Sequence, residues 1–449
     1  MLNKLKDSTW IAGFSQLCVQ YNICSSGMMI ILMEAAGRSL TTVEDSLLDS
    51  AALMGAILGM IIFGQIGDNV GRHTGLLFAL VTTTTGSFLA GTLGCVPLQI
   101  GLHVVMGVGL GGTIPLSAAM AFEDWDVAGA SRSRDDMKEE SGALVNDKKA
   151  ELQHHSLAAM TEEDYGVAEM RVAYANYVQT IGKLLLYLLA YILVDTPLPY
   201  YSQWRLLNVM GGVVSLPAIG MLLHRGLNES QEFVRASRER ERVRRDVYDC
   251  SFLKRVKAEG YLGTLGACAL YWFFFNVVTY GLAVYAPEIV EDIIGTLSVR
   301  QDILLMVLIT VVSLVSALTS LPIIRYFQAR RTLILGMGLS AIAFAVMGAI
   351  VDRISSASQI TLICIVIYCV QLPGIAVFIV PATLFPTHLR AGCHGAAAAV
   401  AKVGAVIGAF GTPIVIDYFG VAKVFEFFAA CLLICFFVVI YAVPVRLIE

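Results

Sequence analysis

The sequence has too few charged residues to cover the surface of a soluble protein. Asp, Glu, Lys and Arg make up 15% of its 449 residues, whereas 57% are hydrophobic and the mean hydropathy is +0.72. A soluble domain carries about 25% charged residues. Because a helix needs about 20 apolar residues to cross a bilayer, the composition indicates a helical protein that crosses a membrane many times.

Motifs that carry enzyme chemistry are also missing. The ten cysteines include no C-x-x-C pair, and most lie inside apolar runs, where they are expected to be packing residues. There is no Walker loop, nucleophile elbow or cluster of metal ligands. The glycine-rich stretch 107–112 lies inside an apolar segment, which favours close helix packing over dinucleotide binding. We therefore expect no enzyme activity, metal site, cofactor or bound nucleic acid.

Apolar segments recur along the chain with short polar breaks. The first is too long for the apolar region of a cleaved signal peptide, which has about 7–15 residues. We therefore expect it to be retained as a helix. The expected membrane spans are 11–33, 47–66, 75–94, 99–121, 172–194, 205–223, 261–286, 303–324, 332–351, 359–380, 394–416 and 424–445.

Two long polar inserts, about 123–171 and 224–260, interrupt these segments. The second is rich in arginine and leaves six spans on each side. The sequence thus predicts an all-α polytopic membrane protein with an N-terminal six-helix half (1–223), a cytoplasmic linker (224–260) and a C-terminal half (261–449). The insert 123–171 is typical of a solvated linker, although a regulatory role is an alternative.

Lysine and arginine gather in the loops on one side of this topology. That side includes both ends of the chain and both inserts. Since cytoplasmic loops collect positive charge, we expect both termini in the cytoplasm. The plasma membrane is the first expectation, with an organelle membrane as the alternative, and we expect a monomer in the lipid bilayer.

The loop after the second span reads G-Q-I-G-D-N-V-G-R-H, from Gly64 to His73. It resembles the G-x-x-x-D-x-x-G-R-[KR] loop of the major facilitator superfamily. Asp68 and Arg72 can pair there near helix ends, and such a pair can hold one conformation and release it in another. The corresponding loop of the second half keeps Arg330 and Arg331 but has Tyr326 where the acid would fall. We expect these charged residues, together with Arg390, to act in gating.

Three further stretches resemble the phosphate:proton symporter branch of that superfamily. They are Gly107–Ala118 in span 4, W-F-F-F-N at 272–276 followed by Tyr280-Gly281 in span 7, and F-I-V-P, F-P-T, Arg390, His394-Gly395 and Lys402-Val403-Gly404-Ala405 between 378 and 405. The resemblance implies the twelve-helix major facilitator fold and a transporter.

That family has carboxylates in spans 1, 4 and 7 that are associated with proton movement and phosphate binding. In this chain the positions hold Val19 and Asn22, Thr113, and Asn276. The resemblance therefore supports the fold better than it supports proton coupling. Tyr21, Asn22 and Thr113 are candidates for a secondary part of the cavity.

Trp272, Asn276 and Tyr280 are spaced four residues apart and therefore share one helix face. An amide between two aromatic rings is a plausible cavity lining. The alternative is an aromatic stripe that packs against a neighbouring helix.

Lys183 and Lys402 fall inside spans, and Gln179 lies one turn before Lys183. A charged group inside a span costs about 2.5–3.5 kcal/mol on insertion scales and usually faces a cavity or a partner. We find no Asp or Glu deep in a span, so a bound anion would be the counter-charge. The alternative is that either lysine extends to the membrane surface.

These observations predict a transporter that moves a small anion, such as phosphate or an organic anion, by uniport, exchange or symport. The predicted binding residues are Gln179, Lys183, Trp272, Asn276, Tyr280 and Lys402. Two alternatives stay open. One is a carrier of a neutral or cationic metabolite, which is sugar-like or choline-like, and the other is a nutrient receptor that does not transport.

Overall fold

The computed structural model describes residues 7–123, 162–226, 229–230, 233–238, 251–294 and 297–444. Most of the insert 123–171 and much of the linker 224–260 lie outside these residues. The predictions made for these two segments are therefore not addressed by the structure.

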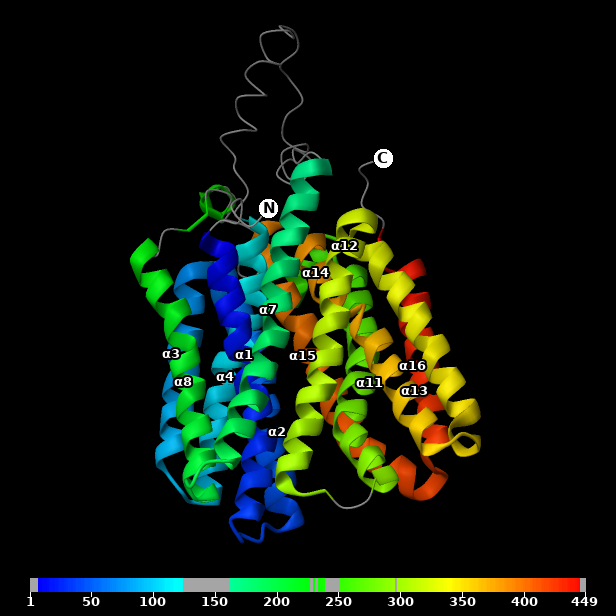
Figure 1. The fold of residues 1–449 in the computed structure, drawn as a ribbon. Helices are drawn as coiled ribbons and strands as arrows, with labels where there is room; N and C mark the ends of the chain where they lie inside the picture. The colour runs from blue at the N-terminus through cyan, green and yellow to red at the C-terminus, as the bar shows by residue number, and fades with distance from the viewer. Residues whose placement is uncertain are drawn as a thin grey trace, which may run out of the picture.

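The described chain is helical (Figure 1). The N-terminal half contains α1 (Asp7–Ala35), α2 (Thr42–Asn69), α3 (Arg72–Thr92), α4 (Val96–Glu123), α7 (Glu162–Val194) and α8 (Tyr200–Arg225). The short α10 (Phe252–Ala258) precedes the C-terminal half. That half contains α11 (Leu262–Ile294), α12 (Val299–Ile350), η3 (Val351–Arg353), α13 (Ser356–Gln371), α14 (Gly374–Leu384), α15 (Thr387–Phe419) and α16 (Val421–Tyr441).

Eleven helical stretches of the described chain are long and apolar enough to cross a membrane. One of them, α12, contains a non-helical residue, Gln328, with φ of 66°, and so comprises the two predicted spans 303–324 and 332–351. Another combines α13 and α14 into a single span. The all-helical membrane fold with two six-helix halves is thus confirmed.

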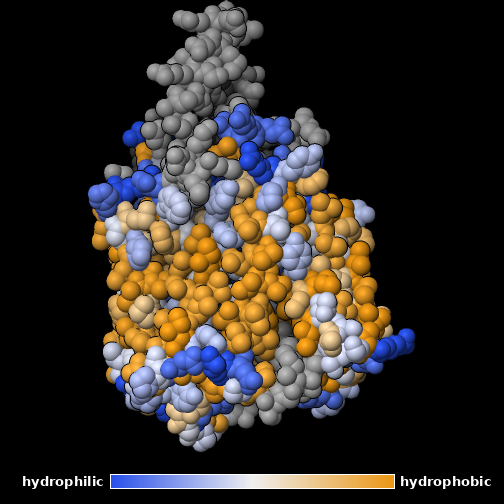
Figure 2. Space-filling model, in the orientation of Figure 1, coloured by the Kyte–Doolittle hydropathy of each residue, from blue (hydrophilic) through white to orange (hydrophobic). Residues whose placement is uncertain are grey.

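Apolar side chains form a broad band around the middle of the bundle on the face shown in Figure 2. Hydrophilic residues gather above and below this band. Such a belt is what a bilayer core requires of the surface that contacts lipid.

Glycines allow α2 and α4 to pack with their backbones in contact. A Cβ atom on Gly107 would lie 2.2 Å from the Ala52 carbonyl oxygen, and one on Gly111 would lie 2.1 Å from the Ala56 carbonyl oxygen. No other residue fits at such an approach. The expectation that this glycine-rich stretch serves helix packing is confirmed.

The two halves meet mainly along α2 with α15 and along α7 with α12. We call the end of the bundle where α1 begins and α16 ends the terminal end; both chain ends lie there in Figure 1. Of these helices, α7 and α12 also contribute residues to the cavity between the halves, and this arrangement positions the candidate site.

Candidate functional site

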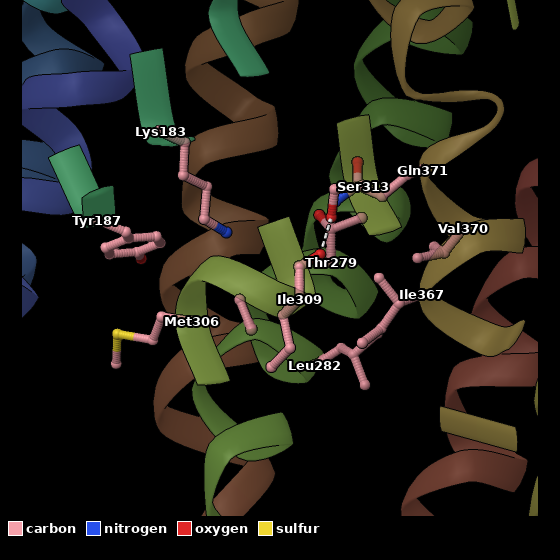
Figure 3. A pocket seen from close by; sticks show the side chains of 11 residues that line it. Lys183, Tyr187, Thr279, Leu282, Met306, Ile309, Ser313, Ile367, Val370 and Gln371 are labelled. Atoms are coloured by element: carbon pink, nitrogen blue, oxygen red, sulfur yellow. Dashed lines mark hydrogen bonds between the residues drawn. The ribbon is translucent and has the colours of Figure 1, made fainter. Parts of the chain in front are cut away.

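A cavity that is partly open to solvent lies between the two halves (Figure 3). The N-terminal half contributes residues from α7 and the C-terminal half contributes residues from α11, α12 and α13. The lining residues are Lys183, Tyr187, Thr279, Leu282, Ala283, Met306, Ile309, Ser313, Ile367, Val370 and Gln371. Because the cavity lies at the junction of the two halves, a relative movement of the halves would change its access to solvent.

Lys183 is the charged residue of this cavity, and its ammonium group points into the space in Figure 3. Its Nζ atom lies 5.8 Å from the ring centre of Tyr187, one turn further along α7. Within the part of the chain that the structure describes, no carboxylate pairs with this lysine. The sequence prediction that Lys183 faces a cavity agrees with this position.

Gln179 lies one turn before Lys183 but belongs to an amide network between α1 and α7. Its Nε2 atom donates to Gln20 Oε1 at 3.0 Å, and its Oε1 atom accepts from Asn176 Nδ2 at 3.1 Å. Gln20 in turn donates to Cys24 Sγ at 3.4 Å. The network holds α7 against α1 and so fixes the helix face from which Lys183 projects.

Lys402 lies on α15, buried, and outside the residues that line this cavity. Its ammonium group donates a hydrogen bond to the Tyr280 hydroxyl and lies 4.4 Å from the centre of that ring. Tyr280 follows the cavity residue Thr279 on α11. The pair thus lies next to the cavity wall, and Lys402 has an aromatic partner that sequence spacing did not identify.

Trp272 and Asn276 share one face of α11, as predicted, and that face packs against α15. Asn276 Nδ2 donates to the Ala401 carbonyl at 3.0 Å, and Trp272 makes an edge-to-face contact with His394 at 5.3 Å. Both side chains are buried. In the structure these two residues thus match the alternative that the sequence left open, a stripe of residues that packs against a neighbouring helix.

The structure places Tyr21, Asn22 and Thr113 inside the N-terminal half, away from the cavity. The Tyr21 hydroxyl donates to the Leu207 carbonyl at 3.1 Å, and Asn22 Nδ2 donates to the Gly211 carbonyl at 3.1 Å. Thr113 donates to the carbonyl one turn earlier in its own helix. All three side chains are buried. Tyr21 and Asn22 join α1 to α8, Thr113 bonds within α4, and none of the three lines the described cavity.

A buried ionic cluster joins the two halves at the terminal end. Asp68 pairs with Arg72 at 3.1 Å, and Asp68 also accepts from the backbone amides of Ala391 (3.1 Å) and Gly392 (2.7 Å) on α15. The Glu123 carboxylate binds Arg72 at 3.0 Å within the N-terminal half and Arg390 of α15 at 2.7 Å. The predicted gating residues Asp68, Arg72 and Arg390 are thus brought together.

Glu229, in the linker, caps the first turn of α3. Its carboxylate accepts from the backbone amides of Arg72 (2.8 Å) and His73 (3.0 Å) and pairs with His73 Nδ1 at 3.1 Å. Burial alone would raise the pKa of Glu229. The hydrogen bond and charge of His73, with the amides of Arg72 and Thr74, outweigh that effect and lower the pKa below its usual value. The linker is therefore attached to the ionic cluster.

The second predicted gating loop has a different arrangement. Arg330 donates to the carbonyls of Val439, Ile440 and Val443 at 3.1–3.3 Å and thus caps the end of α16 within its own half. Arg331 is exposed. The halves are joined here by two acids of α7: Glu169 accepts from the Ala329 amide at 3.3 Å, and Glu162 accepts from Gln328 Nε2 at 3.3 Å.

At the opposite end, α7 and α12 are joined by an exposed ion pair between Asp195 and Arg300 at 3.0 Å. An exposed pair contributes about 0–1 kcal/mol. A buried, multiply hydrogen-bonded cluster is harder to separate. Among these described ionic contacts, the terminal end is therefore held together more firmly than the opposite end.

Sequence reasoning missed several of these residues. Glu123 begins the first polar insert and Glu229 lies within the second, where the sequence gives no reason to distinguish them from ordinary solvated acids. Gln20 belongs to a polar series with Cys24 at a spacing of four residues, which is a signal that could have been found. Asp49 lies two turns inside α2, beside Gly27 of α1, so the acids are not confined to the ends of the spans.

Comparisons with known proteins agree with this architecture. The family model described as "Sugar (and other) transporter" matches residues 168–446. The inorganic phosphate transporter PT2 of Toxoplasma gondii is 25% identical over 426 residues, which cover 91% of this chain and 67% of that protein. The repressible high-affinity phosphate permease of Neurospora crassa is 24% identical over 437 residues, which cover 89% and 75%.

A solved structure of the proton:xylose symporter XylE superposes with a TM-score of 0.71 at 15% identity and covers 98% of this chain and 95% of that one. At this identity the similarity shows the fold alone. The family match extends over more than half of the chain and includes every helix of the C-terminal half. Together with the two-half fold, it shows that this protein belongs to the sugar (and other) transporter family of the major facilitator superfamily.

Proposed function

We propose that this transporter moves a small anion, inorganic phosphate or an organic anion, by alternating access of the cavity between its halves. The observation that carries the proposal is the Lys183 ammonium group, which points into that cavity without a carboxylate partner among the described residues. A charged group inside a membrane span usually faces a cavity or a partner of opposite charge. An anionic substrate would supply that charge.

The relatives support an anion as the substrate class, because both proteins named above are described as phosphate transporters or permeases. The positions at which the phosphate:proton symporters carry acids hold Asn22, Thr113 and Asn276 here. We therefore expect uniport or exchange to be favoured over proton symport through those positions. Lys402, with Tyr280, would add positive charge beside the cavity wall.

A neutral metabolite is the second candidate. Besides Lys183, the polar groups of the cavity are the hydroxyls of Tyr187, Thr279 and Ser313 and the amide of Gln371. Such groups are common in sites for uncharged polar ligands. A receptor that binds its ligand without transporting it is the third possibility, and flux measurements separate it from the other two.

The distribution of Lys and Arg supports a topology with the terminal end in the cytoplasm. In that orientation the ionic cluster of Asp68, Arg72, Glu123 and Arg390 would close the cytoplasmic side. We propose a monomer in the plasma membrane, with the linker 224–260 connecting the halves on the cytoplasmic side.

The test is uptake by purified protein in proteoliposomes, with and without a pH gradient, of phosphate, an organic anion, a sugar and choline. An ammonium–anion pair at 4 Å is worth about 4 kcal/mol at an effective dielectric constant of about 20, and desolvation offsets part of this. Lys183→Met should therefore lower anion uptake at least about tenfold.

Lys423→Met is the matched control, because Lys423 is exposed and pairs with Glu426 at 2.7 Å far from the cavity. It should transport like the wild type. Unchanged anion uptake by Lys183→Met would contradict the proposal. Uptake of the sugar or choline with no anion uptake would identify a different substrate class, and binding without flux would identify a receptor.

A further inference from the structure

The walls of the cavity differ in character from one side to the other. Figure 3 shows Lys183 and Tyr187 projecting from α7, while the residues from α11, α12 and α13 face them across the space. Most of the latter are apolar; they are Leu282, Ala283, Met306, Ile309, Ile367 and Val370. The cavity therefore presents a single positive charge on one side and a largely hydrocarbon surface on the other.

The Thr279 and Ser313 hydroxyls of the cavity have little to donate to a ligand. The Thr279 hydroxyl donates to the Phe275 carbonyl at 3.1 Å, and the Ser313 hydroxyl donates to the Ile309 carbonyl at 3.1 Å. Both hydrogens are thus used within their own helices. The Lys183 ammonium group, the Tyr187 hydroxyl and the Gln371 amide are the other lining side chains that carry donor hydrogens.

Inorganic phosphate does not suit this set of groups. It has four strongly hydrated oxygens, and each needs a donor when water is removed. These few donor side chains cannot replace that hydration shell. A phosphate ion would also leave the apolar wall in contact with water, so the burial of this surface would contribute nothing to binding.

We infer that the cavity takes an organic anion with one negative charge, held at Lys183, and an apolar body that packs against α12 and α13. This inference rests on the proposed anion transport and names the substrate class. The charged head is a carboxylate, because a phosphate monoester carries a charge of about −1.5 to −2 at pH 7 and, like inorganic phosphate, more hydrated oxygens than these donors can serve.

The experiment measures the binding of short straight-chain carboxylates to the purified full-length protein by calorimetry. Acetate, butyrate and hexanoate form the first series, ethyl and butyl phosphate form the second, and inorganic phosphate and hexanamide are the comparison ligands. Each buried methylene contributes about 0.8 kcal/mol, or about fourfold in affinity. Hexanoate should thus bind more than tenfold tighter than butyrate and tighter than phosphate. The steeper gain is expected in the carboxylate series.

Ile309→Thr tests the apolar wall, and Leu308→Thr is its matched control. Leu308 is the preceding residue of α12, is 55% exposed and lies outside the lining. Ile309→Thr should reduce the gain from butyrate to hexanoate at least fourfold, whereas Leu308→Thr should keep it.

Phosphate binding tighter than every organic anion, and lost in Lys183→Met, would overturn this inference and leave the proposed anion transport intact. Hexanamide binding as tightly as hexanoate, with no effect of Lys183→Met, would overturn both. An equal affinity for acetate and hexanoate would also refute the apolar contact.

Discussion

Replacing Glu123 by glutamine should loosen the contact between the two halves at the terminal end. The carboxylate accepts from Arg72 Nε (3.1 Å) and Nη2 (3.0 Å) and from Arg390 Nη1 (2.7 Å), and it is 1% exposed. The bond to Arg390 joins the halves directly. A hydrogen bond to a charged group is worth about 1.5–3 kcal/mol, which corresponds to about a 10- to 150-fold change in the ratio of joined to separated halves.

Hydrogen exchange of peptides from 387–395 measures this change, because the amides of Ala391 and Gly392 donate to Asp68 across the same contact. Exchange that proceeds through separation of the halves should accelerate by the same factor in Glu123→Gln. Glu426→Gln is the control, since Glu426 forms an exposed pair with Lys423. Wild-type exchange in the folded Glu123→Gln variant would refute the assignment of this cluster as the contact that holds the halves together.

Three further predictions concern packing, the second lysine and the linker. Gly111→Ala should abolish folded protein, because the added Cβ would lie 2.1 Å from the Ala56 carbonyl oxygen. The control is Gly101→Ala, whose Cβ meets nothing within 4 Å and which should fold. Size-exclusion profiles of the two purified variants measure the difference. Tyr280→Phe removes the hydroxyl that accepts from Lys402 and should destabilise the protein by about 1–3 kcal/mol, measured as a lower thermal midpoint. Because the pKa of Glu229 is lowered, its cap on α3 is fully present above the usual glutamate pKa and is lost only as pH falls through the lowered value. Hydrogen-exchange rates of the backbone amides in the first turn of α3, corrected for intrinsic pH effects, should therefore stay constant from pH 7 to about 5. Glu229→Gln should raise these rates over the whole range. A rise in the wild-type protein between pH 7 and about 5 would contradict the cap.

The membrane spans and the helix-packing glycines could be read from the sequence, because both depend on local composition. A span needs a run of apolar residues, and the contact of Gly107 with Ala52 needs only that a Cβ be absent. The break at Gln328 was also expected, since the charged residues that follow it separate two apolar segments.

The site was harder to predict because the spacing of residues on a helix face does not show which other helix packs against that face. The spacing of Trp272, Asn276 and Tyr280 placed them on one face, but only the tertiary structure shows that this face meets α15. In the sequence, Lys183 and Lys402 have the same description, because each is a lysine inside an apolar segment. Their difference arises from Tyr280, which lies over a hundred residues away from Lys402 in the chain.

The ionic contacts suggest how binding in the cavity and movement of the halves are linked. Lys183 reaches the cavity from α7, and the same helix contacts α12 through Glu169 near the terminal end and through Asp195 at the other end. An anion that bridges Lys183 and the wall of α12 would bind best in the conformation that brings these helices together. A ligand with such differential affinity shifts the equilibrium between conformations.

The central claim is that an anion binds beside Lys183. The most direct measurement is a crystal structure with 4-bromobenzoate, in which the anomalous signal locates the bromine atom. We predict a carboxylate oxygen within about 4 Å of Lys183 Nζ, with the bromine against Ile309 and Ile367 and no signal in Lys183→Met crystals. A bromine peak beside Lys402 with the cavity empty, or a peak in the cavity that persists in Lys183→Met, would contradict the claim.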